Sequence, residues 1–286
     1  MMCAACGIAG ADDIKLKKCT ACYLVRYCSV KCQKDHRPHH KKECKKRMAE
    51  LRDEILFKQP ESTNLGDCPI CCILLELDDR KTLMMTCCGK TICGGCCYAN
   101  QMRQAKSLCP FCRQPVPETQ EEAKKHIMKR VEANDPAATY QAGVLCFKEG
   151  DYKGAFAYCT KAAGLGDMAA HFELSCLYRN GEGVEKDEKK HLHHLEQAAI
   201  GGHPLARHNL AKFEWESGRT ERTVKHFIIA SKLGHDESLE SLKKCYGMGL
   251  ISKEDFAAAL RGHQAVVDAM KSPHRDEAKA ALRIKG

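Results

Sequence analysis

The 286-residue sequence contains no run of about 18 uninterrupted apolar residues, so no membrane-spanning helix is expected. Its first six residues, MMCAAC, lack the apolar stretch of a secretory signal. It also lacks a glycine-rich phosphate loop and a nucleophile elbow, and so gives little support to a hydrolase or a methyltransferase. We therefore expect a protein of the cytoplasm, the nucleus or both, without a catalytic residue of its own.

Cysteine is abundant instead, with 21 residues, of which 17 lie within the first 112 positions. Because cytosolic thiols stay reduced, metal binding explains this number better than disulfides do. The formal charge of +9 counts every cysteine as neutral. Fifteen zinc-bound thiolates and four Zn²⁺ ions together contribute −7, which leaves about +2. The basic excess mostly balances the zinc sites, and nucleic acid is not the expected partner.

The first cysteine block has a regular spacing. It reads Cys3-x2-Cys6, Cys19-x2-Cys22, Cys28-x3-Cys32 and His40-x3-Cys44. A two-residue gap lets both thiolates reach one ion at about 2.3 Å. A three-residue gap does the same from one helical turn, because positions i and i+4 share a face. These eight ligands suffice for two closed structural sites, which supply the stability that about 45 residues cannot obtain from an apolar core.

The string Tyr27-Cys28-Ser29-Val30-Lys31-Cys32-Gln33, followed by His40 and Cys44, resembles a MYND zinc finger over residues 3–44. The resemblance implies the following ligand sets: Cys3, Cys6, Cys28 and Cys32 for one ion, and Cys19, Cys22, His40 and Cys44 for the other. His36 is a rival of His40. MYND fingers dock short proline-containing peptides through a glutamine and a tryptophan. Gln33 matches the glutamine, whereas Arg37 stands in the tryptophan place.

The second block contains three Cys-x2-Cys pairs and a further ligand group, which is a zinc signature. It reads Cys68-Pro69-Ile70-Cys71, Cys87-Cys88-Gly89-Lys90-Thr91-Ile92-Cys93-Gly94-Gly95-Cys96 and Cys109-Pro110-Phe111-Cys112-Arg113. The block resembles a RING finger over residues 68–117. Many RING fingers read Cys-Gly-His-x-x-Cys where this chain has Lys90, and a lysine does not ligate zinc.

On the pattern of the all-cysteine RING variant, Cys87 would be the third ligand and Cys88 the fourth. The resemblance then implies eight metal ligands in this module: Cys68, Cys71, Cys87, Cys88, Cys93, Cys96, Cys109 and Cys112. Adjacent cysteines on one ion are geometrically awkward. A three-ligand site, or a ligand recruited from a neighbouring segment, remains the alternative. In total we expect four Zn²⁺ per chain, and we expect Cys72 and Cys97 to be small buried residues.

The RING resemblance also implies a partner. In active RING fingers the residues in the places of Ile70, Pro110 and Arg113 contact a ubiquitin-conjugating enzyme. This chain has an apolar residue, a proline and a basic residue at these three positions.

Residues from Ala137 onward form an internal repeat. Dipeptides that begin with Ala or Leu recur at intervals of 32, 36 and 32 residues. They are Ala142-Gly143, Leu174-Ser175, Leu210-Ala211 and Leu242-Lys243. Each repeat reads as a helix pair, and such pairs stack into a solenoid because one pair cannot bury its apolar face alone. The segment Ala170 to Val184, followed by Glu196-Gln197-Ala198-Ala199, resembles Sel-like repeats, which implies a scaffold for other proteins. The histidines at 191, 193 and 194 are expected to face solvent.

The predicted fold is thus two small zinc-stabilised modules, a MYND finger and a RING finger, followed by an all-α helix-pair solenoid. The expected boundaries are 1–47 for the MYND-type finger, 48–64 for a helical linker, 65–117 for the RING-type finger, 118–135 for a linker helix, 136–271 for the Sel-like repeats and 272–286 for a tail. The preferred function is a RING-type ubiquitin-protein ligase whose finger and repeats select protein partners. The alternative is a non-catalytic zinc-finger adaptor or scaffold.

Overall fold

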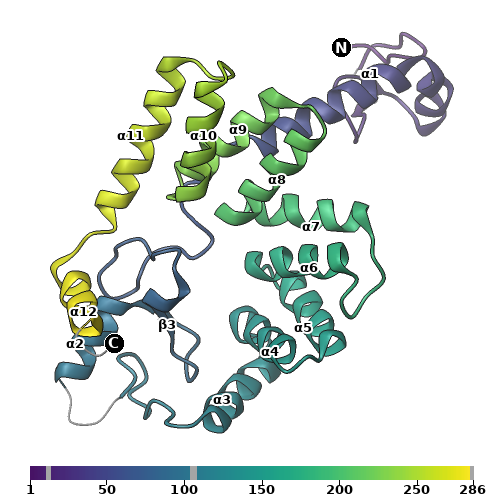
Figure 1. Ribbon diagram of the computed structural model, residues 1–286. Coiled ribbons are helices and arrows are strands. Elements are labelled where there is room, and N and C mark those ends of the chain that lie inside the picture. Colours follow the sequence, from purple (N-terminus) through teal and green to yellow (C-terminus); the bar gives the residue numbers. More distant parts are fainter. Residues whose placement is uncertain (11–13, 104–107, 284–286) are drawn as a thin grey trace. The chain divides into compact units, whose positions relative to one another are not determined.

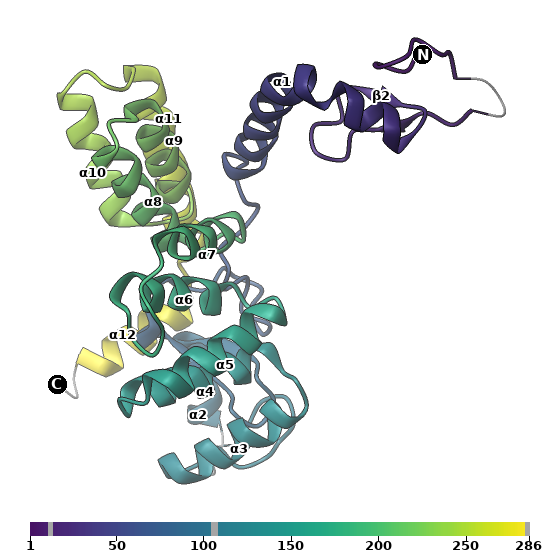
Figure 2. The ribbon, with the colours of Figure 1, turned by 90° about the vertical axis from the view of Figure 1, so that its right-hand side faces the viewer.

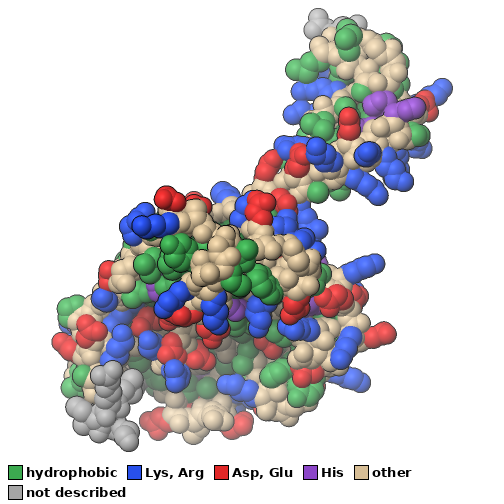
Figure 3. Space-filling model, turned by 45° about the horizontal axis from the view of Figure 1, so that its top comes forward, with side chains coloured by type: hydrophobic (Ala, Val, Ile, Leu, Met, Phe, Trp, Pro, Cys, Tyr) green, Lys and Arg blue, Asp and Glu red, His purple; other side chains and the backbone are tan. Residues whose placement is uncertain are grey.

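The computed structural model describes residues 1–10, 14–103 and 108–283 (Figure 1). The chain divides into two compact units, Met1–Lys58 and Gln59–Gly286. Among the helices described, none is long and apolar enough to cross a membrane. Over most of the face drawn in Figure 3, basic side chains are interspersed with acidic ones.

The first unit combines a two-stranded ribbon with one long helix. Strands β1 (Lys17–Lys18) and β2 (Arg26–Tyr27) are antiparallel, and α1 spans Val30–Leu56. A helical linker was expected over 48–64, but α1 begins eighteen positions earlier because the Ser29 side chain caps it, accepting the amide of Cys32 at 3.2 Å. It also continues through Pro38, which removes one amide donor without ending the helix.

The second unit begins with the RING-like module, residues 65–117. A 3-10 turn, Asp79–Lys81, precedes the antiparallel strands β3 (Thr82–Met84) and β4 (Thr91–Cys93), and helix α2 (Gly94–Arg103) follows. Helix α3 (Gln120–Glu132) lies within the expected linker helix of 118–135 and begins after Thr119, whose side chain accepts the amide of Glu122 at 3.2 Å. Met84 of the module packs against the buried face of α3.

Four helix pairs follow, as the repeat predicts. Their helices can be followed by their labels in Figure 2. The pairs are α4 (Pro136–Lys148) with α5 (Tyr152–Gly164), α6 (Met168–Asn180) with α7 (Glu188–Ile200), α8 (Pro204–Glu216) with α9 (Thr220–Ser231), and α10 (Asp236–Gly247) with α11 (Lys253–Ala269). The leading residues of the repeated pairs are all buried, namely Ala142, Leu174, Leu210 and Leu242. The helix-pair solenoid is therefore confirmed.

The caps of the first helix in each pair follow the same intervals. Asp135 and Asp167 accept backbone amides with carboxylate oxygens, both at 2.8 Å. His203 and His235 take over this role with Nδ1, both at 3.2 Å. An imidazole can do so only while Nδ1 carries no proton.

The segment expected to be a tail contains helix α12 (Pro273–Arg283), which packs against α2 of the RING-like module (Figure 1).

The expectations for Cys72 and His191 were wrong. Cys72 was expected to be buried but is exposed, whereas Cys97, for which the same was expected, is half-buried. His191 is buried, and its Nδ1 lies 2.8 Å from the carbonyl oxygen of Ser175.

Candidate metal centres

The sixteen expected ligands come together in four groups, within each of which all ligand atoms lie within 4.8 Å of one another. Site 1 is Cys3, Cys6, Cys28 and Cys32; site 2 is Cys19, Cys22, His40 and Cys44; site 3 is Cys68, Cys71, Cys93 and Cys96; site 4 is Cys87, Cys88, Cys109 and Cys112. Zinc with four thiolates at about 2.3 Å requires sulfur atoms about 3.8 Å apart. This spacing is the test that each group has to meet.

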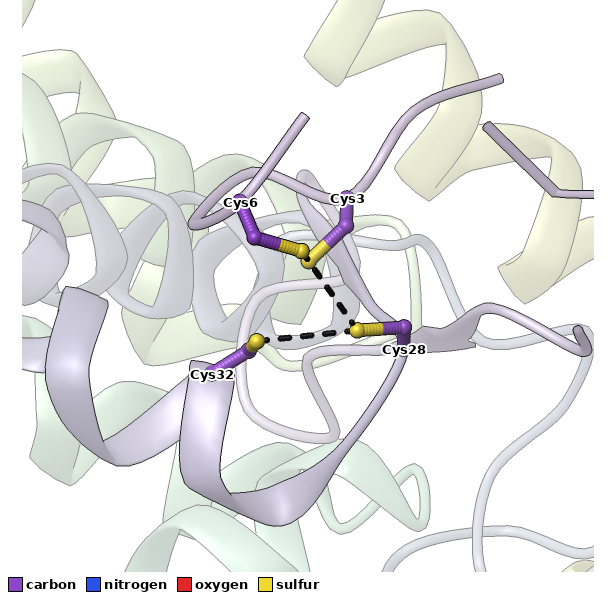
Figure 4. A group of neighbouring side chains, drawn as sticks. All are labelled: Cys3, Cys6, Cys28 and Cys32. Carbon is purple, nitrogen blue, oxygen red and sulfur yellow. Dashed lines mark hydrogen bonds between the residues drawn. The ribbon is translucent and has the colours of Figure 1, made fainter. Parts of the chain in front are cut away.

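Site 1 meets the test (Figure 4). The Sγ of Cys28 lies 3.6 Å from that of Cys6 and 3.5 Å from that of Cys32. Cys28 directly follows β2, and Cys32 lies in the first turn of α1. The Ser29 cap therefore fixes the start of the helix that presents one of the ligands.

Site 2 includes a histidine. The Nε2 of His40 lies 3.1 Å from the Sγ of Cys22, and the Sγ atoms of Cys19 and Cys44 are 4.0 Å apart. The rival residue, His36, is engaged elsewhere, since its Nδ1 lies 3.0 Å from the Tyr27 hydroxyl. His36 stacks on the ring of His40 and helps to hold it in place.

Sites 3 and 4 interleave along the chain, which is the cross-braced arrangement of a RING finger. In site 3, the Sγ atoms of Cys71 and Cys93 are 3.8 Å apart. In site 4, Cys88 lies 3.7 Å from Cys109, and Cys87 contacts Cys112. Both adjacent cysteines thus face the last knuckle and supply two ligand atoms, without a ligand from a neighbouring segment.

Lys90 has a different role from the histidine found in its place in many RING fingers. Its side chain is exposed, and Nζ lies 4.4 Å from the ring centroid of Phe111 in the last knuckle. A cation over an aromatic face is stabilising. Lys90 therefore supports the knuckle by packing and not by ligation.

Four of the five Cys-x2-Cys pairs are knuckles that share one backbone geometry, whereas Cys96 lies within α2. The residue after each second cysteine is left-handed, with φ between 55° and 74°; these are Gly7, Tyr23, Cys72 and Arg113. Its amide donates to the carbonyl of the first cysteine at 2.8–3.0 Å. The reversal turns amides of the loop toward the first thiol.

These amides favour the thiolate form that binds metal. Hydrogen bonds from the backbone of Cys28 and Cys6 lower the pKa of Cys3 to about 6. Burial opposes ionisation of Cys68, yet the amides of Cys71 and Cys93 outweigh it and lower its pKa to about 7. The first cysteines of the other two knuckles behave alike. Burial opposes ionisation of these thiols, but hydrogen bonds from backbone amides outweigh it. They lower the pKa to about 6 for Cys19 and to about 7 for Cys109.

The expected partner-binding residues occupy the surface of the modules. Ile70, in the first RING-like knuckle, is 43% exposed. Pro110 is half-buried and Arg113 exposed in the last knuckle. Gln33 is half-buried on α1, one turn before the exposed Arg37.

Comparisons with known proteins agree with the zinc geometry of the first unit. Residues 3–44 match the MYND finger family. Over 51 residues, 18% of this chain, the sequence is 39% identical to SET domain and MYND-type zinc finger protein 6 of Schizosaccharomyces pombe. The match spans only 11% of that protein.

Several solved structures resemble the chain, and two of them are repeat proteins. One is a Sel1 repeat protein from Oxalobacter formigenes, at 28% identity and a TM-score of 0.46, over 54% of this chain and 66% of that one. The other is a protective antigen of uropathogenic Escherichia coli with an SLR fold, at 23% identity and a TM-score of 0.41, over 59% of this chain and 36% of that one.

The four groups fit four zinc ions, and the first module is a MYND finger. A MYND finger is thus joined, in one chain, to a second zinc module and an array of helix pairs.

Proposed function

We propose that this protein is a protein-interaction adaptor and a RING-type ubiquitin-protein ligase, whose RING-like module recruits a charged ubiquitin-conjugating enzyme. The observation that carries the proposal is the exposure of Ile70 on a knuckle of a cross-braced pair of zinc sites. An isoleucine held in place by a zinc knuckle has no role in the core of the module. It offers a rigid apolar anchor for a partner.

The shape of the two knuckles supports the same function. Because they share one backbone geometry, Ile70 and Pro110 project from equivalent loops, and Arg113 follows the second loop directly. Arg113 can donate several hydrogen bonds to the enzyme and to ubiquitin at once. The ligase supplies no nucleophile, because the amine of a substrate lysine attacks the thioester that joins ubiquitin to the conjugating enzyme. An isopeptide bond to ubiquitin forms, the C–S bond breaks, and the enzyme's cysteine leaves as the thiol.

The test uses the full-length protein with a panel of ubiquitin-charged conjugating enzymes, measuring discharge of ubiquitin to free lysine. Removing a central apolar anchor costs about 1–2 kcal/mol, so Ile70→Ala should slow discharge roughly tenfold with four zinc ions retained. Leu83→Ala is the matched control, because Leu83 is 40% exposed in the same module. Arg113→Asn suits the left-handed backbone better than alanine and should slow discharge more than it weakens docking.

The adaptor without ligase activity is the second candidate, and Lys90 favours it. At the sequence position of Lys90, many RING fingers have a zinc-ligating histidine. Here the position holds an ammonium group, which lies over Phe111 in the knuckle that carries Pro110. If full-length protein stimulates discharge from none of the panel, the ligase proposal falls. The zinc modules and repeats then act only by holding partners.

A further inference from the structure

Arg275, in the first turn of α12, is a buried arginine with only 2% of its surface exposed. Its Nη1 donates to the carbonyl oxygens of Leu74 and Met270, both at 2.9 Å. Its Nη2 donates to the carbonyl of Ile73 at 3.2 Å. The guanidinium thus binds the backbone that leaves the first RING-like knuckle, about 200 residues earlier in the chain.

The same guanidinium reaches a metal ligand. Nη2 lies 4.0 Å from the Sγ of Cys71, within the range of a hydrogen bond to sulfur. Metal ligands are oriented by such outer partners, and replacing those partners commonly weakens metal binding about 10–100-fold.

Charge explains why an arginine is tolerated in this buried place. A buried cation needs a compensating negative charge. The nearby carboxylate of Glu76 pairs with lysines, at 3.2 Å from Lys81 and 3.6 Å from Lys279. Four thiolates around one Zn²⁺ carry a net charge of −2, and site 3 therefore offers the compensation that Arg275 needs.

The burial of Arg275 opposes its charge, but the thiols of Cys93 and Cys71 more than offset this and raise the pKa of the guanidinium above its ordinary value. An arginine stays protonated in any case. Its role is therefore that of a permanent cation with a fork of donors.

Gly95 makes the approach of α12 possible. A Cβ atom at Gly95 would lie 2.7 Å from the amide nitrogen of Arg275 and 2.8 Å from the carbonyl carbon of His274. Glycine lets the two helices pack backbone to backbone. Ala278, one turn further along α12, is buried as well.

We propose that Arg275 is an outer-sphere positioning residue of zinc site 3, so that α12 is an integral part of the RING-like module. The guanidinium holds the Cys71 thiolate and the two following carbonyls in one geometry. This proposal rests on the zinc sites and is independent of ligase activity. It implies that a fragment ending near residue 120 lacks one component of site 3.

The experiment compares full-length Arg275→Met, Arg275→Lys and the control Lys279→Met, each loaded with ¹¹³Cd²⁺ in place of zinc. Cadmium-113 NMR reports each site separately, and Cys71→Ser identifies the site 3 resonance by its loss. Arg275→Met should move or remove this resonance alone, Arg275→Lys should move it less, and Lys279→Met should leave it in place. In parallel, chelator titration of the zinc-loaded proteins should show one of four ions bound about 10–100-fold more weakly in Arg275→Met.

Four unchanged resonances in Arg275→Met, together with a lowered unfolding temperature, would show that Arg275 only packs and would overturn the proposal. Equal changes at all sites would also count against it, because they would indicate general unfolding. If Arg275→Met loses only the site 3 ion while Arg275→Lys keeps it, the proposal stands.

Discussion

The Sγ atoms of Cys87 and Cys112 lie 3.4 Å apart, although the two residues belong to different segments of the RING-like module. The next residue, Cys88, directs its Sγ to Cys109 at 3.7 Å. The two adjacent cysteines therefore divide the last knuckle between them. This division resolves the geometric difficulty of placing neighbouring residues on one ion.

The first prediction concerns this site. Cys87→Ser and Cys88→Ser should each lower the zinc content from about four to about three ions per chain, because three ligands hold the metal weakly. Lys90→Ala should leave it unchanged, because the Lys90 ammonium group packs over the Phe111 ring and ligates no metal, and the substitution keeps the backbone. Elemental analysis of the purified variants measures the content. Zinc loss in Lys90→Ala, or full retention in both cysteine variants, would refute the assignment of site 4.

Removing zinc with a chelator should unfold the part of the second unit that precedes α3 and leave the helix pairs that follow α3 folded. The helix pairs α4 to α9 bury their own apolar residues, so their helical structure should persist without metal. The RING-like module should unfold, and α3 and α12 should loosen because each packs against it. Hydrogen exchange with mass spectrometry, with and without a chelator, measures this by segment. Simultaneous loss of protection throughout α4 to α9 would contradict an independent solenoid.

Acid should destabilise the repeats through His203. Burial lowers the pKa of His203 to about 4, whereas an unfolded histidine titrates near about 6.5. Between these values the unfolded chain binds more protons than the folded one. The stabilisation is therefore complete above about pH 6.5 and declines as the pH falls toward 4, by at most about 1.4 kcal/mol per pH unit.

His203→Asn tests this dependence, because asparagine keeps an uncharged cap acceptor that does not titrate. The variant should lose less stability than the wild type between about pH 7 and about pH 5.5, as measured by thermal unfolding followed by circular dichroism. Comparison of the two proteins cancels the acid sensitivity of the zinc sites. Equal losses would mean that protonation of His203 does not matter.

The packing of α12 against α2 depends on Gly95 having no Cβ atom. Gly95→Ala places a methyl group within 3 Å of the α12 backbone, so that helix has to shift. Amide protection in residues 273–281 should fall, and digestion by trypsin near the C-terminus should accelerate. Gly164→Ala is the control, since a Cβ there meets no atom within 4 Å. Unchanged protection in Gly95→Ala would show that α12 does not depend on this contact.

Local spacing made much of the structure predictable. Ligands with two or three residues between them reach one ion by geometry alone. Burial selects the residues that mark the repeats, namely Ala142, Leu174, Leu210 and Leu242. The resemblance to known fingers supplied the pairing of knuckles. The exposure of Cys72 was missed because the left-handed turn after Cys71 is a property of the knuckle and not of the residue.

Long-range contacts carried no local signal. Nothing in the sequence near Arg275 indicates that it reaches Cys71, and α12 was expected to be part of a tail. His191 lies in a largely polar run, 188–194, yet it is buried because it faces α6. Such placements arise from the packing of whole helices, which spacing within a short segment does not determine.

The central claim is that the chain contains two cross-braced modules with four structural zinc sites. Native mass spectrometry of the freshly purified full-length protein, compared with the mass of the acid-denatured chain, counts the bound ions directly. The account predicts four Zn²⁺ per chain. Two or fewer would contradict it.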